Sequence, residues 1–240
     1  MILVSCCNEN GGLYVVDPES GKVETVLDLE VRGVVKLNGY WFAASGPGTS
    51  KSRKIHKLDA GFNIVATYGD ERDWHGLEVR DGNLLAVDAV KDEIVELDSD
   101  LGLVRTITWH DTDEKRHTND ICPIESGLLL SSFGQGISLM PVSGPAVRKY
   151  RTGDQPHSVT VGGGRVWWCD SKAGLVLRDR EIMRNSDRYL RGLRVVAGGF
   201  WYGESNRRGH SSGNCAMLRH SDGLTIEMPS PEIYTMRIMQ

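Results

Sequence analysis

Six polar residues occupy equivalent positions along this 240-residue chain. An apolar segment begins nine residues after each of the first five, so the spacing is constant. The six side chains offer imidazole, guanidinium, amide and phenol groups, which bind metal ions, bind anions and transfer protons. We call these positions the ring, and they are Arg32, His75, Asn119, His157, Arg191 and Tyr234.

Three histidines are candidate metal ligands. His75 and His157 are ring members, and His117 lies two residues before Asn119, on the same face of an extended chain. Neutral imidazoles that approach one point are ligands of zinc and related divalent ions. We therefore expect a divalent metal ion as cofactor, Zn, Fe or Mn rather than Ca. The alternative is that these histidines only bridge neighbouring segments by hydrogen bonds.

Other residues of the ring have the chemistry to hold and convert an anionic substrate. Arg32 and Arg191 could clamp a carboxylate or a phosphate group. Tyr234, or Glu232 two residues before it, could transfer a proton. We assign catalytic roles to these four residues and expect Asn119 to contact the substrate.

Two residues outside the ring are further candidates for substrate binding. Trp74 precedes His75, which places it at the same site, whereas the other tryptophans are expected to pack in the core. Arg207 lies in the basic, Gly- and Ser-rich segment 205–213, which could cover an anionic ligand. An ordinary solvated loop is the alternative for that segment.

Carboxylates stand thirteen residues after three of the ring positions, at Asp88, Asp170 and Glu204. If an antiparallel strand returns to the ring there, these carboxylates would lie near His75, His157 and Arg191, respectively. Carboxylates in such places orient metal-bound histidines and anion-binding arginines. We expect this role for all three.

The segments that carry the ring have the pattern of β-strands. Short runs rich in Val, Leu, Ile and Trp alternate with Gly and Asp turns, and no 3.6-residue period is evident. The pattern repeats after roughly forty residues, the length of one four-stranded propeller blade. We predict an all-β, six-bladed β-propeller that forms a single domain over residues 1–240. A β-sandwich of similar strand count would give no constant repeat length.

The two ends of the chain complement each other. Residues 1–30 supply only three strands, and the chain ends with an unmatched strand over 234–238. If this C-terminal strand closes the first blade, six equal units result and two open sheet edges disappear. The first strand of each blade would then line the central channel, with the ring at one of its mouths.

The composition argues against several classes of protein. The net charge is −4, and acidic and basic residues are mixed, without the basic stripe that nucleic acid requires. No apolar run approaches membrane-spanning length, and the N-terminus lacks the basic start of a signal peptide. Five scattered cysteines fit a reducing compartment. We expect a cytoplasmic protein with a small anionic ligand and neither nucleic acid nor membrane as partner.

The repeated motifs also resemble those of a bacterial six-bladed propeller family of unknown function. The matching segments are His75-Gly76-Leu77, His117-Thr118-Asn119-Asp120-Ile121, Pro156-His157-Ser158 and Arg191-Gly192-Leu193. Asp120 stands where that family has Gly. The resemblance implies the propeller fold and a site at these residues, but no particular reaction.

Two other groups of propellers are similar in architecture only. Gluconolactonase-like propellers bind metal through Glu, Asn and Asp side chains that suit calcium. The lyase domain of the peptide-amidating enzyme uses three histidines and zinc beside Tyr and Arg, which is closer to the residue types here. We therefore expect a metal-dependent hydrolase, lyase or isomerase that acts on a small anionic substrate. The alternative is a propeller that binds a small ligand or peptide without converting it.

Overall fold

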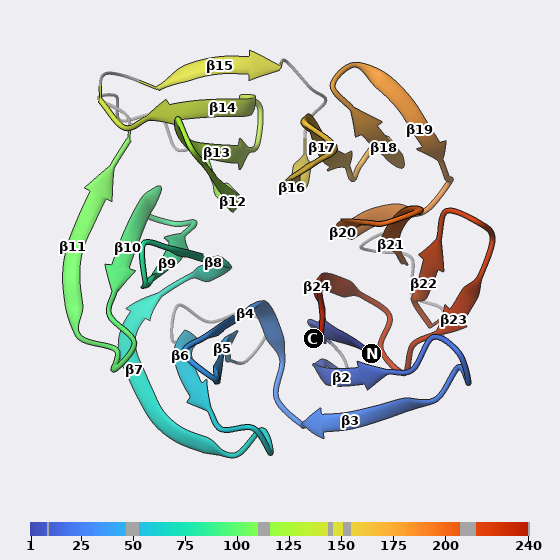
Figure 1. The fold of residues 1–240 in the computed structure, drawn as a ribbon, viewed down its shortest axis with the longest axis horizontal. Coiled ribbons are helices and arrows are strands. Elements are labelled where there is room, and N and C mark those ends of the chain that lie inside the picture. Colours follow the sequence, from blue (N-terminus) through green and yellow to red (C-terminus); the bar gives the residue numbers. More distant parts are fainter. Residues whose placement is uncertain are drawn as a thin grey trace.

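The computed structural model describes residues 1–8, 10–46, 53–109, 116–143, 146–150, 155–206 and 215–239. These residues form six four-stranded antiparallel sheets arranged as the blades of a β-propeller (Figure 1). No helix able to span a membrane occurs among the residues described. The predicted fold class is confirmed.

The innermost strand of each blade comes first in the following sequences of strands. The first three blades are β24 (Ile233–Ile238), β1 (Ile2–Cys6), β2 (Gly12–Val16) and β3 (Val23–Leu27); β4 (Val31–Leu37), β5 (Tyr40–Ser45), β6 (Arg53–Leu58) and β7 (Ile64–Arg72); and β8 (Trp74–Arg80), β9 (Asn83–Asp88), β10 (Glu93–Leu97) and β11 (Leu103–Thr108). The other three are β12 (Thr118–Ile124), β13 (Gly127–Ser132), β14 (Gly136–Pro141) and β15 (Val147–Tyr150); β16 (Pro156–Gly162), β17 (Arg165–Asp170), β18 (Leu175–Arg178) and β19 (Glu181–Asn185); and β20 (Tyr189–Val196), β21 (Gly199–Ser205), β22 (Met217–His220) and β23 (Thr225–Glu227).

The first blade combines both ends of the chain, as expected. Strand β24 pairs antiparallel with β1, with Ile2 opposite Ile238 and Val4 opposite Met236. The N- and C-termini consequently lie in the same blade (Figure 1). This pairing closes the circle of blades, because the last strand of the chain is hydrogen-bonded to the first.

The hydrophobic core lies mainly between adjacent blades. Phe42 and Ile55 of one blade, for example, pack in the same buried cluster as Trp74 and Leu84 of the next. Trp74 is fully buried there, and its ring lies 6.0 Å from that of Tyr68. Trp74 therefore packs in the core and does not face the ring, contrary to the expected substrate contact.

Every innermost strand has a register shift close to its ring residue. The pairing with the second strand shifts between Val31 and Val34 in β4 and between Trp74 and Leu77 in β8. Corresponding shifts occur in β12, β16 and β20, and in the pairing of β1 with β24. Because a β-bulge bends the strand and redirects its side chains, these bulges place the ring residues at the channel.

Candidate functional site

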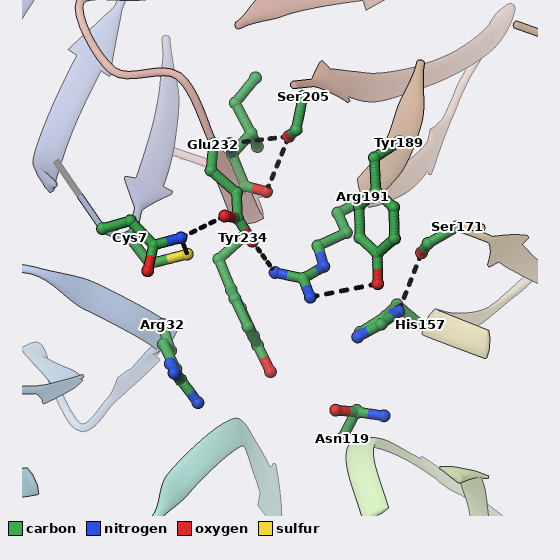
Figure 2. Close-up of polar contacts among 12 residues, drawn as sticks. Cys7, Arg32, Asn119, His157, Ser171, Tyr189, Arg191, Ser205, Glu232 and Tyr234 are labelled. Atoms are coloured by element: carbon green, nitrogen blue, oxygen red, sulfur yellow. Dashed lines mark hydrogen bonds and ion pairs between the residues drawn. The ribbon is translucent and has the colours of Figure 1, made fainter. Parts of the chain in front are cut away.

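The six ring side chains come together, although they are far apart in the sequence. Their exposed fractions run from 0% for Asn119 to 7% for Arg32. Figure 2 shows Arg32, Asn119, His157, Arg191 and Tyr234 pointing toward a common space from different strands. Six buried polar groups around one channel are costly unless they satisfy one another or a ligand. The ring is therefore the candidate site of this protein.

His75 has polar contacts at both nitrogens of its imidazole. Its Nδ1 lies 2.8 Å from the Tyr234 hydroxyl and 3.2 Å from Asn119 Oδ1. Its Nε2 contacts Arg32 Nη1 and lies 3.2 Å from Asp73 Oδ2. Asn119 Oδ1 can only accept and the Arg32 guanidinium can only donate, and both contacts favour a proton on Nδ1, whereas the Asp73 carboxylate, which can only accept, favours a proton on Nε2. The Tyr234 hydroxyl can accept from a protonated Nδ1 or donate to an unprotonated one, so its contact fits either tautomer.

The tautomer of His157 follows from the partners of its Nδ1. Its Nδ1 lies 3.0 Å from the Gln155 carbonyl oxygen and 2.8 Å from Ser171 Oγ. The Ser171 hydroxyl donates its own proton to the Leu190 carbonyl, so both partners accept from His157. The proton consequently sits on Nδ1. Among the residues described, Nε2 has no hydrogen-bond partner although it is buried, so its lone pair is available to a ligand.

Burial keeps both imidazoles neutral. Loss of solvation and the nearby Arg32 lower the pKa of His75 well below its usual value. Loss of solvation and Arg191 lower the pKa of His157 in the same way. Burial, reinforced by Asp120, raises the pKa of the Tyr234 phenol above its usual value. At neutral pH the ring thus contains two neutral imidazoles and a protonated phenol.

Three guanidiniums in the described part of the mouth pair with carboxylates. Arg32 lies 3.3 Å from Asp73 and 3.7 Å from Glu30. Arg53 also pairs with Asp73 and lies 3.6 Å from Glu30. The third guanidinium, that of Arg191, pairs with the Glu232 carboxylate. These carboxylates balance the three positive charges and fix the directions of the guanidiniums.

The Arg191 and Glu232 pair lies close to two tyrosines. Although burial opposes its charge, Glu232 raises the pKa of Arg191 above its usual value. The guanidinium carbon lies 4.8 Å from the Tyr189 ring and 5.0 Å from the Tyr234 ring. Glu232 was predicted to move a proton, but its carboxylate contacts Arg191 and the Asn8 amide. Glu232 therefore positions the Arg191 guanidinium.

The three histidines are linked by a chain of ring contacts that includes Phe133. The His75 and His117 rings lie 5.1 Å apart, and Phe133 lies next to both His117 and His157, at 4.7 Å and 5.4 Å. No group of three His, Cys, Asp or Glu side chains suited to a metal ion occurs in the described part of the chain. His75, with both nitrogens engaged, fits a metal ligand poorly, whereas His157 Nε2 fits one well. The three-histidine centre stays a prediction.

Two of the three carboxylates expected to orient ring residues bind other groups. Asp88 accepts hydrogen bonds from the backbone of the following turn, at Val90 and Lys91, and lies 3.5 Å from Arg72. Glu204 binds Arg219 at 2.5 Å. The expected neighbours of His75 and Arg191 were therefore wrong, because the bulges break the simple alternation from which they were derived.

The third carboxylate, Asp170, is not in register with its expected histidine. Asp170 stands opposite Pro156 in the ladder, whereas His157 faces Cys169, and Asp170 accepts a hydrogen bond from the Ala173 backbone at 3.4 Å. His157 is oriented instead by Ser171 and the Gln155 carbonyl. The remaining predicted residue, Arg207, lies outside the described residues.

Three residues, Arg53, Asp73 and Phe133, also contribute to the mouth, although no role was assigned to them from the sequence. Arg53 comes from a segment with the composition of a basic loop, yet it is 2% exposed and begins β6. Asp73 lies two residues before His75, and only this spacing hinted at its place on the same face. Phe133 follows β13 directly. A signal for Phe133 exists in the sequence, because the equivalent positions in the other blades hold small residues.

Comparison with known proteins shows the fold but no family. No protein-family model and no curated protein matches the chain. A protein of unknown function from Bacteroides caccae is 14% identical, with a TM-score of 0.75 over 98% of this chain and 97% of that one. Virginiamycin B lyase from Staphylococcus aureus is 13% identical, with a TM-score of 0.61 over 99% of this chain and 85% of that one. A chain of a nidogen and laminin complex is 11% identical, with a TM-score of 0.71 over 98% and 96%. At these identities the likeness concerns architecture alone, so the chain is a six-bladed β-propeller similar in fold to both enzymes and proteins of unknown function.

Proposed function

We propose that the ring is the active site of an acid–base enzyme that acts on a small carboxylate-bearing molecule. The single observation that carries this proposal is the buried, unprotonated Nε2 of His157, which has no partner among the described residues. A neutral imidazole whose lone pair faces a polar space has the properties of a general base. Among hydrolases, lyases and isomerases we favour a lyase, since two lyases share the fold.

The acid in this proposal is Tyr234. In the tautomer of His75 that carries its proton on Nδ1, His75 donates to the phenol oxygen, and the Tyr234 hydroxyl proton can then be given to a leaving group or an oxyanion. The resulting phenolate would be stabilised by that hydrogen bond and by Arg32 and Arg191, which lie 5.8 Å and 5.0 Å from the Tyr234 ring. In an elimination, His157 Nε2 takes a proton from carbon, the carbon–heteroatom bond breaks, and Tyr234 protonates the leaving atom.

The substrate carboxylate would be held by hydrogen bonds from Arg191 and Arg32. Because the guanidiniums are matched by carboxylates, their attraction for the anion is local and directional rather than a strong net field. The proposal therefore concerns a small molecule that fits into the mouth. Asn119, which donates to the His117 carbonyl at 3.1 Å, would act by holding His75 in place.

Proton exchange at carbon tests the proposal even while the natural substrate is unidentified. The parent protein should convert, or deuterate in D₂O, at least one member of a panel of small 2-hydroxy, 2-oxo and 2-amino carboxylates, as followed by NMR. His157→Gln and Tyr234→Phe should each lower that rate roughly a hundred- to ten-thousandfold. His220→Gln, outside the ring, is the matched control. If the rate survives both ring substitutions, or if the panel binds without any exchange, the acid–base proposal fails and a non-catalytic binding protein is favoured.

A metal-dependent form of this chemistry is the second candidate. The observation that favours it is again His157, because metal-ligating histidines commonly donate their other nitrogen to a backbone carbonyl, as Nδ1 does to Gln155. A divalent ion would supply Lewis-acid stabilisation of a substrate oxygen. Calorimetric titration of tag-free protein with Zn, Fe and Mn should then give one ion per chain. That ion should be lost in His157→Ala and kept in His56→Ala. Parental affinity in His157→Ala would remove this candidate.

A further inference from the structure

One blade departs from the others at the mouth of the channel. The residue fourteen positions after the ring residue is small in four blades, at Gly46, Ala89, Ser171 and Ser205, and the first blade has Cys7 at the corresponding exit of β1. The blade that contains β12 and β13 has Phe133 instead. A phenylalanine is not required by the architecture at this position, because five blades do without it.

Phe133 packs against a histidine with an unusual backbone. The Phe133 and His117 rings lie 4.7 Å apart in a tilted arrangement, at an interplanar angle of 33°. His117 has a φ of 47°, in the left-handed region that costs a side-chain-bearing residue energy. Both side chains are only partly buried. His117 and Phe133 therefore form a partly exposed aromatic pair that contacts the ring histidines His75 and His157.

This aromatic surface adjoins the proposed acid–base groups. The His157 ring meets Phe133 edge-on, with 5.4 Å between centroids at 73°. On the other side, the His75 ring meets His117 at 5.1 Å and 89°. The imidazoles of His75 and His157 thus border the His117 and Phe133 pair. Arg32, Arg191 and Glu232, which carry the charges, come from other blades, and the Tyr189 and Tyr234 rings lie beside Arg191 there.

We propose that His117 and Phe133 form a stacking platform that selects ligands with a planar, conjugated ring joined to a carboxylate. The inference rests on the proposed function, because it names the substrate class of the same site. The carboxylate of the ligand would contact Arg32 and Arg191, and the planar ring of the ligand would lie on the platform. A saturated ring of the same size has a puckered surface and would contact the platform less closely.

The platform can be tested with two small carboxylates that differ only in whether their six-membered carbon ring is planar. Benzoate and cyclohexanecarboxylate have the same carboxylate, and NMR titration of the parent protein gives a Kd for each. We expect benzoate to bind about three- to tenfold more tightly. Phe133→Leu keeps apolar bulk without a planar face and should abolish this preference. Phe133→Tyr should retain it, and Phe62→Leu, at a phenylalanine that stacks on Trp41, is the control.

His117 is tested separately because of its backbone. His117→Asn removes the imidazole and preserves the left-handed conformation, which asparagine tolerates. It should reduce the preference as Phe133→Leu does. Equal binding of the two carboxylates by the parent, or a preference that survives both substitutions, overturns the platform but leaves the acid–base proposal standing. If neither carboxylate binds at about 20 mM, a concentration that detects even weak fragments, both the platform and the carboxylate-binding ring are wrong.

Discussion

A chain that ends at Glu232 should fail to fold cooperatively. The missing strand β24 supplies Ile233, Tyr234 and Met236, each 2% exposed or less. Burial of three such side chains is worth roughly 5 to 9 kcal/mol, which is comparable to the entire stability of a typical domain. The deletion also leaves the inner edge of β1 unpaired and opens the circle beside β20 and β4. Aggregation or a non-cooperative melt should be seen by calorimetry and size-exclusion chromatography.

A shorter deletion separates loss of the strand from loss of chain length. Removal of residues 239–240 leaves β24 whole, so this variant should melt cooperatively and within a few degrees of the parent. If the longer truncation is soluble, monomeric and melts as sharply as the parent, closure of the first blade does not hold the fold together.

Acidification below pH 6.5 should destabilise the protein through its ring histidines. His75 and His157 are neutral in the folded state, whereas unfolded histidine has a pKa of about 6.5. Below that pH the unfolded chain binds more protons, so the free energy of unfolding falls as pH falls. Each histidine contributes a slope of about 1.4 kcal/mol per pH unit until the folded pKa is reached. Urea unfolding at pH 5 and pH 7 measures the sum.

Substitution of His157 isolates its share of this effect. In His157→Gln, the stability lost between pH 7 and pH 5 should be about 2 kcal/mol smaller than in the parent. His220→Gln controls for the loss of an imidazole elsewhere. Asp120 changes the free energy of unfolding in the opposite direction. Burial raises its pKa in the folded protein to about 6, so on acidification the folded protein binds this proton at a higher pH than the unfolded chain does. A His157→Gln difference near zero would mean that His157 titrates normally in the folded protein.

The blades and the ring were predictable because both follow from a repeat. The constant interval between His75 and Leu84, or between His157 and Val166, marks one blade whatever the local details are. Equivalent residues in equivalent strands must then lie around one axis, so the six ring residues could be identified as one group, and the structure shows that all six are buried. The closing strand was predictable for the same reason, since one repeat lacked its inner strand.

The partners of the ring residues were not predictable from the repeat. Strand alternation predicted Asp88 beside His75, but a bulge between Trp74 and Leu77 changes which side chains share a face. The actual neighbours, Asp73 and Asn119, come from outside the strand pair that was considered. Periodicity gives the positions of strands, whereas hydrogen bonds across blades depend on bulges that leave no clear mark in the sequence.

Phe133 and Arg53 illustrate a second limit. Each differs from the residues at equivalent positions in the other blades. An alignment of the repeats identifies what the blades share and gives no information about such differences. Arg53 stands at the start of β6, next to a Gly- and Ser-rich segment typical of a loop, yet its guanidinium reaches the Glu30 and Asp73 carboxylates. The residues that distinguish one blade from another are those that a repeat cannot predict, and here they are the ones that shape the mouth.

The protonation state of His157 decides whether the ring can act as proposed. Long-range ¹H–¹⁵N correlation NMR of protein labelled at histidine reports the tautomer and charge of each imidazole. We predict that His157 is neutral at pH 7 with its proton on Nδ1 and an unprotonated Nε2, and that it stays neutral well below pH 6.5. A His157 that carries its proton on Nε2 at pH 7, or that titrates near pH 6.5, would contradict its role as the buried base of this site.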